Sequence, residues 1–250
     1  MARLSRITLG LLVVFLVICV GSLLYCCRPE RFAAGAAAAA TAIPKIIFQT
    51  SVNPPDDYVV HMIGERAPGW EYRHYTDQDI LQYFESHPLP EFPQIADQFH
   101  RLHGAHKADL FRYYFIYVEG GVFLDSDAMI QVNLDELVQN YGFVSVNSGC
   151  SPHNVPSIFQ GFLGATPHNP IIYRALKDAY TTPRAELDEN YFLWVERLHT
   201  FVHETKYDFT IKLYEESVCN DNGQGVTYDG DKPVIYHYHT SKKIPPPKPT

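Results

Sequence analysis

Cysteine is scarce in this sequence, and it never occurs in the patterns that hold structural zinc. Of the five cysteines, Cys19, Cys26 and Cys27 lie within or beside one apolar run. Only Cys150 and Cys219 belong to the rest of the chain, and neither forms a CxxC pair, which argues against a structural zinc site. The two thiols could pair in an oxidising compartment or stay free and buried, and both alternatives remain open.

Basic residues are in the minority. The chain has 20 lysines and arginines against 28 aspartates and glutamates, a formal charge of −8. Four of the arginines precede Ile43, so the remainder is more acidic still. This balance argues against a nucleic-acid-binding surface. It does not argue against a nucleotide ligand, because a divalent cation can carry the phosphate charge locally.

One long apolar run stands near the N-terminus. Residues Ile7 to Cys26 form an uncharged, mostly apolar stretch of about 20 residues, long enough to span a bilayer as a helix. A cleavable signal peptide is the alternative, but its apolar region is usually shorter, and we favour a retained anchor. The flanking basic residues lean slightly toward a cytoplasmic N-terminus. We therefore expect a single-pass, type II membrane protein with a lumenal, Golgi- or ER-like, catalytic domain.

Composition also divides the chain into parts. No internal repeat is visible, and the length after the apolar run suits one domain with a sizeable core. We expect a short tail at residues 1–6, a transmembrane signal anchor at 7–26, an alanine-rich stem at 27–42, the folded domain at 43–242 and a proline-rich tail at 243–250.

Strand and helix signals alternate through the folded domain. We expect strands at residues 44–50, 70–76, 122–130, 143–147, 158–166, 226–228 and 234–239. We expect helices after the loop at 54–56 and at 77–86, with Thr76 as N-cap, and further helices at 94–117, 170–180 and 188–204. The alternation predicts an α/β fold with a mainly parallel sheet.

The densest chemical signal lies in residues 107–127, KADLFRYYFIYVEGGVFLDSD. Asp109 and Arg112 are three residues apart on the expected helix and therefore share one face. Alone, such a pair could be a plain salt bridge. Here the helix stops at Gly120-Gly121 and leads into an apolar strand that carries two acids, which favours a functional site.

Those two acids end the expected strand. Along a strand, Asp125 and Asp127 would point to the same side, at the carboxyl end where open α/β sheets bind ligands. Adjacent carboxylates repel unless a cation lies there, so Mn²⁺ or Mg²⁺ shared with a substrate diphosphate is the economical explanation. An isolated DxD is a weak signal, and the apolar strand before it makes this one more specific.

Together these segments resemble a known family. The block KADLFRYY…GGVFLDSD, with IPKIIFQT upstream and GWEYRHYTDQDI between them, is similar to the DXD-containing sugar transferases of glycosyltransferase family 32. That family includes α-1,6-mannosyltransferases and sphingolipid mannosyltransferases, and glucosylating toxins share its core pattern more distantly. The resemblance is clear from about Ile43 to Leu137 and weaker from Ser157 to Tyr173.

The resemblance implies a single-domain, Rossmann-like GT-A fold. It implies transfer of a hexose, with retention of configuration, from GDP-mannose or a UDP-hexose to a glycan or lipid hydroxyl. Asp125 and Asp127 match the metal-binding pair, and Asp109 and Arg112 match the residues that hold the donor's sugar and phosphate. These four are the expected catalytic residues. Donor contacts are implied at Phe48, Gln49, Thr50, Lys107, Asp109, Arg112, Gly121 and Asp125.

The sequence also departs from the family pattern. Phe48 and Phe123 stand where the family often has His and Tyr, and Gln160 stands where Asn is common. The C-terminal tryptophans of the family are missing. His237 and His239 share an expected strand face, and we expect His239 to be a third metal ligand, with ordinary core or surface histidines as the alternative.

Two other functions fit parts of the pattern. An inactive relative that only binds sugar or nucleotide would explain the missing tryptophans. A phosphohydrolase with an aspartyl nucleophile also ends an apolar strand in DxD. Such enzymes usually carry Thr or Val where this chain has Met129, and they place the motif near the start of the domain.

Overall fold

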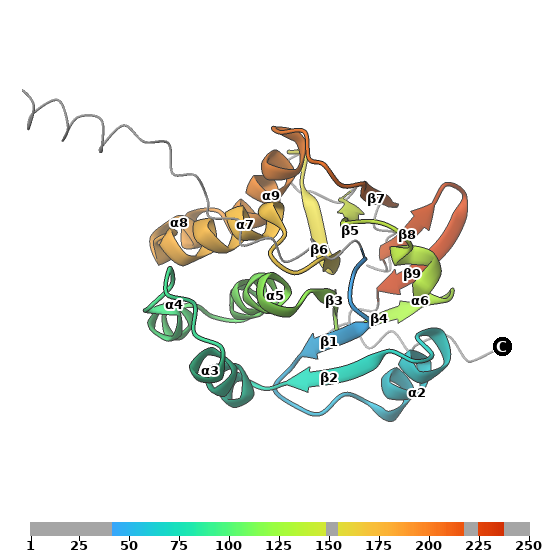
Figure 1. Cartoon of the computed structure of the whole chain (residues 1–250), viewed down its shortest axis with the longest axis horizontal. Coiled ribbons are helices and arrows are strands. Elements are labelled where there is room, and N and C mark those ends of the chain that lie inside the picture. The colour runs from blue at the N-terminus through green and yellow to red at the C-terminus, as the bar shows by residue number, and fades with distance from the viewer. Residues whose placement is uncertain (1–41, 149–154, 218–224, 238–250) are drawn as a thin grey trace, which may run out of the picture. The chain divides into compact units, whose positions relative to one another are not determined.

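The computed structural model describes residues 42–148, 155–217 and 225–237, which all fall in the unit that begins at Ala40 (Figure 1). Within these ranges, no helix is long and apolar enough to cross a membrane. The expected membrane anchor, the stem, His239 and both domain cysteines lie outside the described residues.

Strands and helices alternate along the chain, as the sequence predicts. The strands are β1 (Ile46–Thr50), β2 (Glu71–Tyr75), β3 (Gly121–Leu124), β4 (Ala128–Ile130), β5 (Phe143–Asn147), β6 (Ile158–Ala165), β7 (Ile211–Glu216), β8 (Gly225–Asp229) and β9 (Lys232–His237). The helices are α2 (Asp57–Arg66), α3 (Asp77–Ser86), α4 (Ile95–Arg101), α5 (Ala105–Glu119), α6 (Leu134–Val138), α7 (Pro170–Thr181), α8 (Arg184–Glu189) and α9 (Leu193–His203).

Among the described residues, the strands form one mixed, nine-stranded sheet in the order β2-β1-β3-β6-β5-β7-β8-β9-β4. Pairing is parallel between β1 and β2, β1 and β3, and β5 and β7. It is antiparallel in the other five pairs. The expectation of a mainly parallel sheet is therefore wrong. The successive strands β8 and β9, for example, are joined directly by a tight turn, and such a connection makes antiparallel neighbours.

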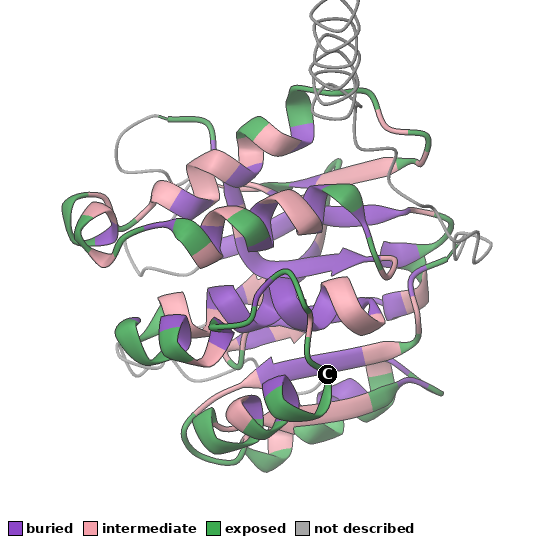
Figure 2. Cartoon of the chain, turned by 60° about the vertical axis from the view of Figure 1, so that its left-hand side comes forward, coloured by how far each residue is buried: buried purple, intermediate pink, exposed green. Residues whose placement is uncertain are grey.

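Helices cover both faces of the sheet (Figure 1). On one face, α3, α4, α5, α7 and α9 enclose a core that includes Phe48 and Phe123. On the other face, α2 and α6 pack against a second core that includes Ile47 and Val122. Sequence neighbours enter different cores because successive strand residues point to opposite faces. Figure 2 shows the central strands and much of α5 buried between these layers.

The long helix expected at residues 94–117 is two helices. The break falls at Gly104, whose φ of +52° is a conformation that favours glycine. After the break, α5 is buried continuously from Asp109 to Ile116. It therefore carries Asp109 and Arg112 into the protein interior rather than along a solvent-facing stripe.

The strand expected at residues 122–130 is also two strands. After Leu124 the chain turns, and the Ala128 amide donates to the Asp125 carbonyl oxygen over 3.0 Å. Both acids of the DxD motif thus lie in a turn, not along one strand. β3 is third in the sheet order and β4 is last. Only this short turn joins β3 to β4. The sheet must therefore curl so that its last strand, β4, lies near β3.

The helix expected at residues 188–204 divides into α8 and α9. Between them, the Asn190 side chain accepts from the Phe192 amide over 3.0 Å and donates to Glu196 over 2.9 Å. These bonds replace helical hydrogen bonds and fix the intervening turn. The turn holds Tyr191 and Phe192 beside the cavity described below.

Two expected element boundaries are confirmed. Thr76 caps α3, since its hydroxyl accepts from the Asp79 amide while the Asp79 carboxylate accepts from the Thr76 amide. Gly120 ends α5 with a φ of +74°, and Gly121 starts β3 with a φ of +102°. A Cβ atom at Gly121 would lie 2.7 Å from the Ile46 carbonyl oxygen, so only glycine allows β3 this close to β1.

Candidate functional site

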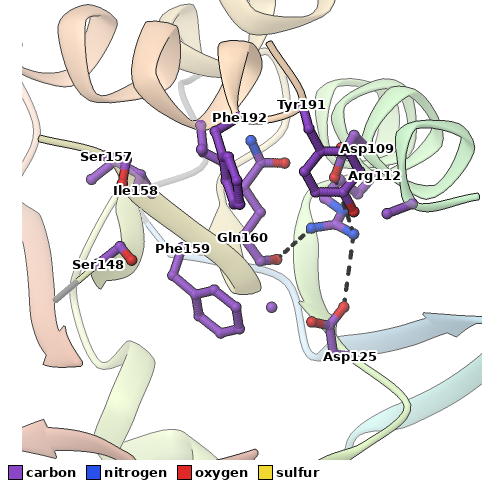
Figure 3. Close-up of a pocket in the computed structure, with 13 residues that line it drawn as sticks. Asp109, Arg112, Asp125, Ser148, Ser157, Ile158, Phe159, Gln160, Tyr191 and Phe192 are labelled. Atoms are coloured by element: carbon purple, nitrogen blue, oxygen red, sulfur yellow. Dashed lines mark hydrogen bonds and ion pairs between the residues drawn. The ribbon is translucent and has the colours of Figure 1, made fainter. Parts of the chain in front are cut away.

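Asp109, Arg112 and Asp125 line one cavity of about 200 Å³ (Figure 3). The helix α5 supplies the first two residues, and the turn after β3 supplies the third. The opposite wall comes from residues 157–161, and the remaining lining includes Tyr191 and Phe192. The structure therefore brings together three residues that lie up to 16 positions apart in the DxD block.

Arg112 is the centre of this arrangement. Its Nη2 lies 3.3 Å from Asp109 Oδ1 and 3.7 Å from Asp125 Oδ1, so one guanidinium faces two carboxylates. Its Nη1 donates to the Gln160 carbonyl oxygen over 2.7 Å. Its planar group lies 3.9 Å from the centre of the Phe123 ring. Arg112 is only 4% exposed, which makes its charge effective at short range.

Burial dominates the electrostatics of the two carboxylates. It raises the pKa of Asp109, an effect that the positive charge of Arg112 partly offsets. Burial likewise raises the pKa of Asp125, again against the opposing effect of Arg112. Groups with such shifts, gathered in a cavity, are typical of functional sites.

Asp127 lies two residues further along the same turn. Burial raises its pKa to about 7, and the neighbouring charge of Asp125 raises it in the same direction. The two acids of the motif thus repel one another when both are ionised. A divalent cation at this point would remove that repulsion.

The residues present suit a hard divalent cation. Asp125 and Asp127 offer carboxylate oxygens, the ligands that Mg²⁺ and Mn²⁺ prefer. In the part of the chain that the structure describes, no cluster of three or more His, Cys, Asp or Glu side chains could hold a metal. The other ligands would have to be water and substrate oxygens, as is common where a metal binds with a phosphate-containing substrate.

Gln49 supports the motif from behind. Its Nε2 donates to the Asp125 carbonyl oxygen over 3.0 Å, and its Oε1 accepts from the Tyr72 hydroxyl over 2.8 Å. Gln49 is fully buried. It therefore holds the turn that carries both acids and does not line the cavity.

The other sequence-predicted site residues lie outside the cavity. Phe48 is buried in an aromatic cluster, with its ring centre 4.1 Å from that of Phe115. Thr50 is half-buried at the end of β1. The ammonium group of Lys107 pairs with Asp77 and lies over the Phe99 ring. Gly121 shapes the start of β3.

The segment Phe159-Gln160-Gly161 on β6 is part of the site, although the sequence marked only Gln160, as a departure from the family pattern, and assigned it no role. A Cβ atom at Gly161 would overlap both Asp125 Oδ2 and the Phe159 ring. Gln160 is 3% exposed, its Nε2 contacts the Tyr113 hydroxyl, and its Oε1 has no hydrogen-bond partner among the described residues. A glycine inside an apolar strand indicates close approach of another group, and this was the available signal.

His237 takes no part in the cavity wall. Its ring packs edge-on against Phe159, with ring centres 4.7 Å apart, and its Nε2 lies 3.3 Å from Thr227 Oγ1. Its strand pairs with β4 so that His237 faces Ala128, the residue after the DxD motif. His239, the expected third metal ligand, lies outside the described residues.

Comparison with known proteins finds a family match over the segment that contains the DxD motif. Residues 56–144 match a family model described as a glycosyltransferase sugar-binding region containing a DXD motif. This part of the chain resembles a sugar-transferase domain. The matched segment contains Asp109, Arg112, Asp125 and Asp127. No curated protein matches the chain. One similar solved structure is the PaToxG glycosyltransferase, with 14% identity over 65% of this chain and 70% of that chain, at a TM-score of 0.48.

Proposed function

We propose that this protein is a metal-dependent, retaining glycosyltransferase related to glycosyltransferase family 32. It moves a hexose from GDP-mannose or a UDP-hexose to a hydroxyl of a glycan or lipid. It uses Mn²⁺ or Mg²⁺ at Asp125 and Asp127. An N-terminal anchor at residues 7–26 would hold it in a membrane, with the catalytic domain on the lumenal side.

The observation that carries the proposal is the position of Arg112 between Asp109 and Asp125 in one buried cavity. A lone i,i+3 salt bridge would need only Asp109. The second carboxylate, Asp125, comes from the turn between β3 and β4, which is far from Asp109 in the sequence. Asp125 nevertheless lines the same cavity. Such a set of fixed charges suits a ligand with both hydroxyl groups and phosphate oxygens.

Each residue then has a defined task. Asp109 accepts hydrogen bonds from sugar hydroxyls and orients the ring. Arg112 interacts with the diphosphate or the sugar beside it, and its bonds to Asp109 and Gln160 fix its orientation. Mn²⁺ or Mg²⁺, when bound, neutralises negative charge on the departing nucleoside diphosphate. The carbon–oxygen bond to the diphosphate breaks and a bond to the acceptor oxygen forms on the same face, while the acceptor proton passes to the leaving phosphate.

A donor screen tests this function. The full chain is incubated with Mn²⁺ or Mg²⁺ and a panel of UDP- and GDP-sugars, and release of free nucleotide is measured. Asp127→Ala should abolish the release, whereas Asp208→Ala, at an exposed aspartate outside the site, should not. Metal-dependent release from one donor would support the transferase and identify the sugar.

The same screen separates the alternatives. If no donor is turned over and no nucleotide binds in a metal-dependent way, the transferase proposal is wrong. Metal-dependent nucleotide binding without turnover would instead support an inactive relative. Hydrolysis of simple phosphate monoesters, lost in Asp125→Asn, would support the phosphohydrolase.

A further inference from the structure

Tyr191 exposes an aromatic ring at the edge of the cavity. The large hydrophobic side chains that are exposed in the described part of the chain are Val52, Val60, Val155 and Tyr191. Tyr191 is the one aromatic residue among them and is 57% exposed, although it lines the same cavity as Asp109 and Arg112. In Figure 3 its side chain lies beside these two residues.

The position of Tyr191 is fixed by its surroundings. Its carbonyl oxygen lies 3.1 Å from His106 Nε2, and its ring centre lies 4.9 Å from that of His106. The Asn190 side chain holds the same turn through the Phe192 amide and Glu196. The ring is therefore held in place before any ligand binds, which lowers the entropic cost of binding against it.

The groups around the ring have a recognisable chemistry. A pyranose ring offers hydroxyls at its edge and apolar C–H groups on its faces. A carboxylate and a guanidinium match the hydroxyls, and an exposed aromatic ring matches the C–H groups. Burial raises the pKa of the Tyr191 hydroxyl, and the negative charge of Asp109 raises it further.

Depth in the cavity distinguishes two sugar positions. Asp109, Arg112 and Gln160 are each at most 9% exposed, so a transferred hexose held by them lies deep. Tyr191 is much more open, at the rim. A ring that stacks on it would lie outside the transferred sugar, which is where the acceptor must approach.

We propose that Tyr191 is the stacking platform for an acceptor pyranose, so that the acceptor hydroxyl belongs to a carbohydrate. This inference rests on the proposed function. It narrows the acceptor from any glycan or lipid hydroxyl to one carried by a sugar ring.

Binding of simple glycosides tests the platform without turnover. Saturation-transfer NMR is recorded on the full chain with Mg²⁺ and UDP or GDP, in a detergent that has no sugar group. The probes are the methyl glycosides of mannose, glucose, galactose and N-acetylglucosamine. At least one should bind the wild-type protein, and Tyr191→Ala should weaken its affinity about tenfold, the equivalent of one lost ring contact.

Two variants control for damage to the fold. Tyr191→Phe keeps the ring face and should stay within about threefold of the wild type, since stacking does not need the hydroxyl. Tyr228→Ala removes a half-buried tyrosine on β8, outside the cavity, and should leave glycoside affinity unchanged. Melting temperatures are compared for all three variants.

Each contrary outcome has its own meaning. If no methyl glycoside binds the wild type, or if Tyr191→Ala binds as well as the wild type, the inference is overturned. If the donor KM rises in Tyr191→Ala as much as glycoside affinity falls, the ring contacts the transferred sugar and the acceptor assignment is overturned. If the wild type hydrolyses no donor, the proposed function is wrong. That outcome is distinct from failure of this inference, because glycoside binding is measured without turnover.

Discussion

Gln49 Nε2 donates a hydrogen bond to the carbonyl oxygen of Asp125 over 3.0 Å, across 76 positions of sequence. The same oxygen accepts the Ala128 amide that closes the DxD turn. The other end of the Gln49 amide is held by the Tyr72 hydroxyl. The edge strand β2 is thus linked through β1 to the turn that carries both metal-binding candidates.

This link predicts that Tyr72→Phe impairs turnover and metal binding, although Tyr72 does not line the cavity. The variant leaves Gln49 Oε1 buried without its donor, which should cost about 1 kcal/mol of stability. Movement of the turn should lower the kcat for donor hydrolysis by about tenfold and raise the Mn²⁺ concentration needed for half-maximal rate. Steady-state kinetics and Mn²⁺ titration measure both effects.

Tyr75→Phe is the matched control for that prediction. Tyr75 belongs to the same strand but packs against the aromatic core on the opposite face of the sheet. The control should keep the wild-type Mn²⁺ dependence. Equal behaviour of the two variants would mean that the Tyr72–Gln49 link does not position the turn.

Gly161 gives a second prediction. A methyl group at this position would overlap Asp125 Oδ2 and the Phe159 ring, so Gly161→Ala must displace the carboxylate or the ring. Overpacking of this kind typically costs about 1–3 kcal/mol, and displacement of Asp125 should lower donor hydrolysis by about tenfold or more. Urea unfolding and donor hydrolysis are the two measurements.

The control for Gly161 is Gly64→Ala on α2. A Cβ atom there meets no heavy atom within 4 Å. Replacing a helical glycine by alanine should therefore stabilise the protein by about 0.5–1 kcal/mol and leave hydrolysis unchanged. Full activity in Gly161→Ala would show that Asp125 can be displaced without loss of function. The close approach of Gly161 to Asp125 would then not be needed for activity.

The local elements were readable from sequence because their signals are local. Thr76 and Asp79 form the capping box that their spacing indicates. Gly120 and Gly121 end the helix and start β3. The apolar residues of β1 and β3 predict buried strands, and both are buried.

What sequence could not provide depends on contacts between distant segments. The curl of the sheet brings β4 beside β9, a pairing that no periodicity records. The short helix α6 and the strand β7 were not expected, because one is barely longer than a turn and the other mixes polar with apolar residues. Within the site, Gly161 lies in a segment of only weak family resemblance and Tyr191 in one with no motif, and their approach to Asp125 and Asp109 makes them part of it.

The raised pKa of Asp127 predicts that its ionised form, the form that binds a metal ion, lowers the stability of the metal-free protein. Its pKa is about 7 in the folded, metal-free chain, above the ordinary value. The protonated form is therefore favoured by folding. The resulting stability is present below about pH 4 and is lost as the pH rises through about 7.

Asp127→Asn should remove this loss of stability at high pH, because the asparagine side chain does not ionise. With a chelator present, the variant should be more stable than the wild type at pH 8, by at most about 4 kcal/mol, and equally stable near pH 4. Thermal melts at the two pH values measure this, with Asp208→Asn as the exposed control. Added Mn²⁺ should stabilise the wild type at pH 8 and not Asp127→Asn. A variant less stable than the wild type at pH 8 would contradict the cost assigned to burying an ionised Asp127 beside Asp125.

Arg112 supplies the last prediction, through the geometry of its guanidinium. One nitrogen donates to the Gln160 carbonyl oxygen, another faces both Asp109 and Asp125, and the plane lies over Phe123. Arg112→Lys keeps the charge but cannot reproduce this planar fork, so donor hydrolysis should fall by about 100-fold. Arg112→Met leaves the buried Asp109 carboxylate and the half-buried Asp125 carboxylate without their cation and should also cost about 3–5 kcal/mol of stability.

Comparing the two variants separates charge from shape. If charge alone mattered, Arg112→Lys would hydrolyse donor at nearly the wild-type rate while Arg112→Met would not. We expect both to lose activity, with a large loss of stability only in Arg112→Met, because lysine still offsets the two carboxylates. Arg101→Lys, at an exposed arginine on α4, should change neither measurement. A fully active Arg112→Lys would show that the guanidinium acts as a point charge and that its hydrogen bond to Gln160 is not needed for turnover.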